Sequence, residues 1–99
     1  MTVTSPGTPT GRVRLTILEW LKDPAAYFPA GRRRDLAATG VTARAVAAKL
    51  GLPPRTVRAH LDLLARLGVL RTRRIRCRVH YRRDETRVAE VARLFDKGW

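Results

Sequence analysis

The strongest constraint in this sequence is a pair of helical patterns separated by only a short turn. In the first, over residues 42–50, apolar side chains recur with the i, i+3, i+4, i+7 spacing of a helix that buries one face, at Ala43, Val46, Ala47 and Leu50. In the second, over residues 54–67, the inner stripe consists of Val57, Leu61 and Leu64. Two amphipathic helices this close in sequence bury their apolar faces against each other.

The residues around the turn suit this arrangement. Thr42 fits the N-cap of the first helix, Gly51 fits the left-handed position that ends it, and Pro54 fits the first turn of the second helix. Ala47 allows the two helices to approach closely, and Val57 fills the corner between them. The spacing predicts a helix-turn-helix over residues 42–67, in preference to a corner of two helices that binds nothing.

The periodicity then changes from helical to alternating. Residues 69–73 and 78–82 are predicted to form two strands joined by a basic turn at 74–77. Seven arginines and no acidic residue lie between Val69 and Arg83, at positions 71, 73, 74, 76, 78, 82 and 83. This concentration exceeds what a solubilising edge strand needs, so we expect a β-hairpin wing that contacts an anion.

The composition agrees with an anionic partner. Lys and Arg number 21 against 8 Asp and Glu, a formal net charge of +13, while 44% apolar residues exclude a disordered basic tail. Nucleic acid is the first candidate, although the arginine content of a GC-rich genome is an alternative. The single Cys77 excludes an internal disulfide and a zinc site with two cysteines from one chain. No apolar run is long enough to span a membrane, so we expect a cytoplasmic protein.

The flanking segments complete one predicted domain, residues 12–99, after a disordered leader at 1–11. Residues 12–22 form a short helix that is apolar on nearly every side and ends at Asp23-Pro24; Asp84 caps a last helix over 84–97. The Tyr27-Phe28-Pro29 segment is interpreted as an aromatic anchor, with a further helical turn near 33–38. Both terminal helices carry apolar stripes that we interpret as a partner surface, at Leu15, Leu18, Leu21, Val88, Val91, Ala92 and Phe95.

From Leu15 to Phe95 the chain resembles the ArsR-type winged-helix transcriptional repressors, most specifically in Thr56-Val57-x-x-His60-Leu61-x-x-Leu64-x-x-x-Gly68. The resemblance implies a homodimer built from the first and last helices, an inverted-repeat operator, and release by an inducing small molecule or protein. The sequence departs from that family at Pro53 and Arg58, where the family has serines. The family's metal-sensing cysteines are replaced by Thr42, Ala43 and Arg44, and the last helix has no histidine, so no metal or cofactor is expected. A site shared by Cys77, His80 and a partner chain is the less favoured alternative.

The exposed residues in the N-terminal half of a recognition helix reach base edges. We therefore expect DNA contacts from Arg55, Thr56, Arg58 and Ala59, and from the wing residues Arg73, Arg74, Arg76 and Arg78. His60 is expected to turn partly inward as a structural residue, and Asp62 to be solvated.

The sequence thus predicts a mainly α-helical protein with a small β-hairpin wing, a dimeric winged helix-turn-helix. The predicted function is sequence-specific regulation of transcription on double-stranded DNA, as a repressor. An enzyme is not expected, because there is no phosphate-binding glycine loop and no clustered acid–base pair. The alternatives are a sequence-neutral nucleoid- or RNA-binding protein, a protein-binding adaptor, and the DNA-binding partner of a two-protein sensor.

Overall fold

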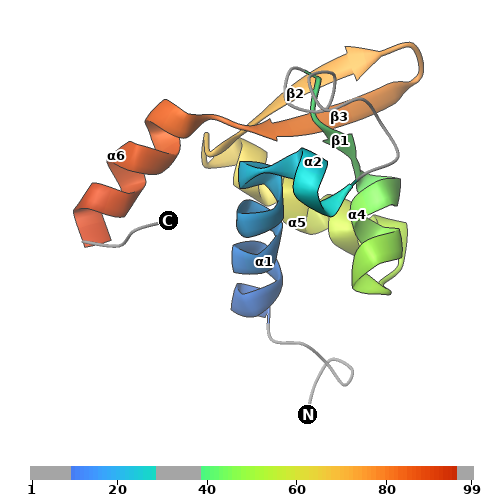
Figure 1. The fold of residues 1–99 in the computed structure, drawn as a ribbon, viewed down its shortest axis with the longest axis horizontal. Coiled ribbons are helices and arrows are strands. Elements are labelled where there is room, and N and C mark those ends of the chain that lie inside the picture. The colour runs from blue at the N-terminus through green and yellow to red at the C-terminus, as the bar shows by residue number, and fades with distance from the viewer. Residues whose placement is uncertain (1–9, 29–38, 96–99) are drawn as a thin grey trace.

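The core lies where three helices meet one face of a small sheet (Figure 1). The computed structural model describes residues 10–28 and 39–95. The elements in chain order are α1 (Thr10–Lys22), α2 (Pro24–Tyr27), β1 (Val41–Thr42), α4 (Ala43–Leu50), α5 (Pro54–Arg66), β2 (Leu70–Ile75), β3 (Arg78–Arg83) and α6 (Glu85–Phe95). The largest fully buried side chains are Ile17 of α1, Val46 of α4, and Val57 and Leu61 of α5. Helices α1, α4 and α5 therefore share a single core.

The turn between α4 and α5 has the predicted geometry. The side chain of Thr42 accepts a hydrogen bond from the Ala45 N–H at 3.2 Å, which caps α4. Gly51 ends α4 with φ 73°, and its N–H donates to the Ala47 carbonyl at 2.8 Å. Pro54 is the first residue of α5. The prediction of a helix-turn-helix is confirmed.

The hairpin is longer than predicted, and its turn is shorter. Strands β2 and β3 pair in register from Leu70 opposite Arg83 to Ile75 opposite Arg78, which leaves only Arg76 and Cys77 in the turn. The prediction placed the strands at 69–73 and 78–82, with a four-residue turn between them. Its bounds were wrong by up to two residues. A two-residue turn needs positive φ, and Arg76 supplies it with φ 58° although it is not a glycine.

A third strand joins the wing to the helix-turn-helix. Strand β1 pairs antiparallel with β3, Val41 opposite Tyr81 and Thr42 opposite His80, so the sheet order is β1-β3-β2. Just before β1, Gly40 has φ 88° and lies so close to the backbone of Tyr81 that a Cβ would overlap the carbonyl group. The start of α4 is thereby fastened to the central strand of the sheet.

Helix boundaries differ from the sequence predictions at several points. Helix α1 begins at Thr10, inside the predicted leader, and ends at Lys22, just before Asp23-Pro24. Pro24 then starts the short helix α2, which was not predicted. Helix α6 begins after Asp84, whose Oδ1 accepts the Arg87 N–H at 3.0 Å as the predicted cap. The rest of the leader, Pro29, the helical turn at 33–38 and residues 96–97 lie outside the described residues. None of the helices described combines the length and hydrophobicity needed to cross a bilayer.

Replacing Gly40 by alanine is expected to lower the free energy of unfolding by about 2–5 kcal/mol. Left-handed backbone at a residue with a Cβ costs about 1–2 kcal/mol, and the overlap with Tyr81 adds about 1–3 kcal/mol. Gly51→Ala is the matched control, because Gly51 is also left-handed but has open space around it. Urea denaturation of both variants measures the difference. Equal losses would contradict the close approach of Gly40 to β3.

Candidate nucleic-acid interface

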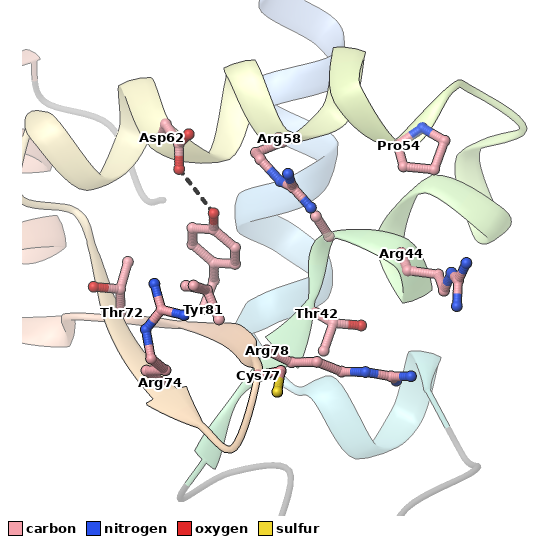
Figure 2. Close-up of a pocket in the computed structure, with 12 residues that line it drawn as sticks. Thr42, Arg44, Pro54, Arg58, Asp62, Thr72, Arg74, Cys77, Arg78 and Tyr81 are labelled. Carbon is pink, nitrogen blue, oxygen red and sulfur yellow. Dashed lines mark hydrogen bonds between the residues drawn. The ribbon is translucent and has the colours of Figure 1, made fainter.

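A cleft of about 620 Å³ separates α5 from the wing (Figure 2). One wall consists of Pro54, Arg58 and Asp62 from α5, and the other of Thr72, Arg74, Cys77, Arg78, Val79 and Tyr81 from the hairpin. Thr42, Ala43 and Arg44, at the start of α4, complete the lining. Among the described residues, four arginines and one carboxylate line this space, so the cleft is suited to an anion.

The recognition surface of α5 is set by its buried side. Because Val57, Leu61 and Leu64 are buried, the opposite side of the helix faces solvent. A helix turns about 100° per residue, so Arg55 and Ala59 lie at the centre of the exposed face. Arg58 lies on the flank toward the cleft and Thr56 on the other flank. All four predicted contact residues are exposed. Their contact with DNA stays a prediction.

The four predicted contact residues of the wing divide between its two faces. Arg73, Arg74, Arg76 and Arg78 are all exposed. Arg74 and Arg78 line the cleft together with Arg58. Arg73 points to the face of the ribbon opposite to that of Arg74, because neighbouring residues of a strand alternate. Arg76 occupies the tip.

Two arginines of the basic segment serve the fold instead. Arg83 is 7% exposed; its guanidinium donates to the Leu18 carbonyl at 2.8 Å and to Glu85 Oε1 at 3.0 Å. Arg71 donates to Asp84 Oδ2 at 2.9 Å. The Arg87 N–H and then Arg71 lower the pKa of Asp84. Arg83 and Arg71, which were not among the expected DNA contacts, thus fasten the base of the wing to α1 and to the start of α6.

Tyr81 joins the two walls of the cleft. The residue is 2% exposed, and its hydroxyl donates to Asp62 Oδ1 at 2.7 Å. Burial, followed by the hydrogen bond and the charge of Asp62, raises the pKa of Tyr81 to about 12, against the opposing influence of Arg58. Asp62, which we expected to be solvated, is instead half-buried and paired. Tyr81 was not among the predicted site residues; its signal in the sequence was a large aromatic residue within an alternating strand.

Arg44 lies at the cleft, and His60 lies at the contact between α5 and α1. Arg44, exposed on the first turn of α4, lines the cleft, although the sequence analysis considered it only as a missing metal ligand. His60 turns partly inward as expected, and its Nδ1 accepts a hydrogen bond from Arg14 Nε at 3.2 Å. Burial and then the charge of Arg14 lower the pKa of His60. His60 therefore acts as a neutral acceptor that ties α5 to α1.

The predicted partner surface is divided between core and solvent. Leu18, Leu21, Val88 and Ala92 are buried within the protomer, Val91 is half-buried, and the side chain of Phe95 lies outside the described residues. Leu15 is 50% exposed. Leu94, which was not predicted, is 78% exposed on α6, a helix that extends away from the body (Figure 1). Among the side chains that the structure describes on α1 and α6, the large apolar ones exposed to solvent are thus Leu15 and Leu94.

Potential metal ligands do not converge in the part of the chain that the structure describes: no three His, Cys, Asp or Glu side chains there form a group that could hold an ion. Cys77 is exposed in the wing turn, and His80 lies on β3.

The α1, α4 and α5 core, the helix-turn-helix and the hairpin beside a basic cleft together define a winged helix-turn-helix protein. No family model matches the sequence. The chain is 33% identical over 79 residues to the uncharacterized HTH-type transcriptional regulator YbzH of Bacillus subtilis (strain 168). The matched region covers 80% of this chain and 79% of that protein. The chain therefore belongs to the family of HTH-type transcriptional regulators, which are typically not enzymes.

The free energy of unfolding is expected to fall between about pH 10 and pH 12. The unfolded chain releases the Tyr81 proton near pH 10, whereas the folded protein keeps it to about pH 12. Over this window the folded state binds more protons, so stability decreases as pH rises, by up to about 1.4 kcal/mol per pH unit. Tyr81→Phe should remove this part of the decline. Urea denaturation at several alkaline pH values compares the slopes, and the same slope in both proteins would contradict the assignment.

Proposed function

We propose that this protein is a sequence-specific regulator of transcription that binds double-stranded DNA and acts as a repressor in the cytoplasm. The observation that carries the proposal is the exposed N-terminal half of α5 beside a cleft lined by arginines. An α-helix fits the major groove of B-DNA, and an arginine bonded to guanine through two hydrogen bonds contributes about 1–3 kcal/mol of discrimination. In this arrangement Arg55 and Arg58 read base edges, with Thr56 and Ala59 beside them.

The cleft provides a place for the sugar–phosphate strand that borders the groove. With α5 in the groove, this strand passes between α5 and the wing, where Arg44, Arg74 and Arg78 neutralise phosphates. Arg76 at the tip reaches the next stretch of backbone or the narrow minor groove. Arg73, on the outer face of the ribbon, adds to the positive field there. Phosphate contacts fix the register, and base contacts supply the specificity.

We further propose that the protein acts as a homodimer formed through α1 and α6. This is supported by the exposed Leu15 and Leu94 on these helices, and by the resemblance to ArsR-type repressors. A two-fold axis presents two copies of α5, which match an inverted-repeat operator. An inducing small molecule or protein would release the dimer from DNA, and no cofactor is proposed.

Selection of bound duplexes from a random pool tests the proposal. The expected result is an enriched motif with two inverted half-sites about one helical turn apart, centre to centre. Absence of any enriched motif would overturn sequence-specific regulation in favour of a sequence-neutral basic protein. A single or asymmetric half-site would overturn the homodimer and favour the DNA-binding partner of a two-protein sensor.

Arg58→Ala and Arg76→Ala are expected to weaken DNA binding in different ways. Arg58→Ala should reduce affinity for the selected duplex about tenfold and for a scrambled duplex much less, because it loses base contacts. Arg76→Ala should weaken both duplexes alike and reduce the salt slope by about one. Titrations at several salt concentrations measure both effects.

Arg12→Ala is the matched control for charge. Arg12 is an exposed arginine near the start of α1. The start of α1 lies on the side of the molecule away from the wing (Figure 1). The removal of Arg12 subtracts the same charge and should leave both affinities nearly unchanged. Equal losses on the two duplexes for Arg58→Ala would exclude Arg58 as a reader of sequence.

A further inference from the structure

We infer that the hydrogen bond between Tyr81 and Asp62 is a positioning device: it fixes the separation of α5 from the wing, and thereby decides how strongly the protein prefers its operator over other DNA. This inference rests on the proposed function and adds two positioning residues to it. Neither residue was among those expected to contact DNA. The bond spans the cleft from the sheet to the recognition helix, as Figure 2 shows.

The hydroxyl of Tyr81 is held in one place by the sheet. Tyr81 lies on β3, the central strand, opposite Val41 of β1 on one side and Thr72 of β2 on the other. Its ring is almost completely buried, so the side chain has little freedom to move. The backbone of Gly40, just before β1, lies close to the Tyr81 carbonyl and restrains this part of β3. The donor of the hydrogen bond is therefore a rigid reference point.

The acceptor lies on the part of α5 that matters for recognition. Asp62 follows Arg58 by four residues, so the two side chains share one side of the helix, and both line the cleft. A bond of 2.7 Å to Asp62 therefore fixes the height and rotation of Arg58 relative to the sheet. The wing beyond Tyr81 carries Arg74 and Arg78, whose distance from Arg58 depends on the same connection.

The charge of Asp62 indicates that its bond to Tyr81 does more than stabilise the fold. Asp62 is the one carboxylate among the described residues that line the cleft, where the proposed ligand is a polyanion. A negative charge there opposes the binding of any phosphate chain. An apolar pair would join the walls without that cost. A carboxylate instead gives a directional bond to the Tyr81 hydroxyl, although its charge lowers the affinity for all DNA alike.

The consequence is a difference between two kinds of binding. Operator binding requires base contacts from α5 and phosphate contacts from Arg74 and Arg78 in one rigid geometry. Sequence-neutral binding requires phosphate contacts alone, which α5 and the wing can make independently. Breaking the bond should therefore weaken operator binding and leave sequence-neutral binding nearly unchanged.

The test compares variants at a temperature well below the unfolding midpoint of each. Tyr81→Phe removes the bond, whereas Asp62→Asn keeps an acceptor oxygen and removes only the charge. Tyr81→Phe should lower the ratio of affinities for selected and scrambled duplexes about fivefold. Asp62→Asn should keep the ratio and raise both affinities by a similar factor. An unchanged ratio in Tyr81→Phe, or an equal fall in Asp62→Asn, would overturn the inference.

A second measurement needs no DNA. Spin labels on Cys77, the single cysteine, and on Arg66→Cys, at the exposed end of α5, report the distance from the wing turn to the helix. Labelled protein is diluted into unlabelled protein so that only distances within one chain are measured. The distribution of distances should broaden in Tyr81→Phe and remain narrow in Asp62→Asn. An unchanged distribution in Tyr81→Phe would overturn the inference.

Asp62→Ala removes the same bond from the side of the helix, so the test survives if Tyr81→Phe does not fold. Its distance distribution should broaden as well, and a narrow one would count against the inference. The two measurements also separate the two proposals. Broadened distances without any motif from the random pool would overturn the proposed function and support the positioning of α5 by Tyr81.

Discussion

Burial of the inner stripe of α5 is the interaction on which the rest of this structure depends. Val57, Leu61 and Leu64 pack into the core formed with α1 and α4, and each such side chain contributes about 1.5–3 kcal/mol when it is removed from water. Rotation of α5 by one residue position would expose this stripe and bury charged side chains. The packing thus fixes which side of α5 faces solvent. The arginines on that side are exposed because of this packing, whether or not a ligand is bound.

The net charge of +13 is distributed over residues with different tasks. Arg83 and Arg71 hold the wing against α1 and α6 through short contacts with Leu18, Glu85 and Asp84. The other arginines of the wing are exposed as well, and Arg74 and Arg78 among them line the cleft. A surface field of this sign accelerates encounter with a polyanion and makes the affinity depend on salt, but it does not by itself select a sequence. Selection requires the rigid geometry that the core and Tyr81 impose on α5.

Local sequence rules predicted the helix-turn-helix, because each rule there concerns residues within a few positions of one another. Thr42 caps α4, Gly51 adopts the left-handed conformation, and Pro54 opens α5. Features that depend on distant residues were missed. Strand β1 has only two residues and therefore no readable alternation, and the bond of Tyr81 to Asp62 joins positions 19 residues apart. The turn of the wing was predicted, but its two-residue length was not, because the positive φ of Arg76 occurs without glycine or asparagine.

The most direct test of the account is to map the DNA-binding surface on the whole chain in solution. Backbone amide chemical shifts of isotopically labelled protein, followed during titration with a duplex enriched from the random pool, report which segments contact DNA. The account predicts the largest changes in the first half of α5, at the start of α4 and in the turn of the wing. Changes concentrated on α1 and α6, with α5 and the wing unaffected, would contradict it.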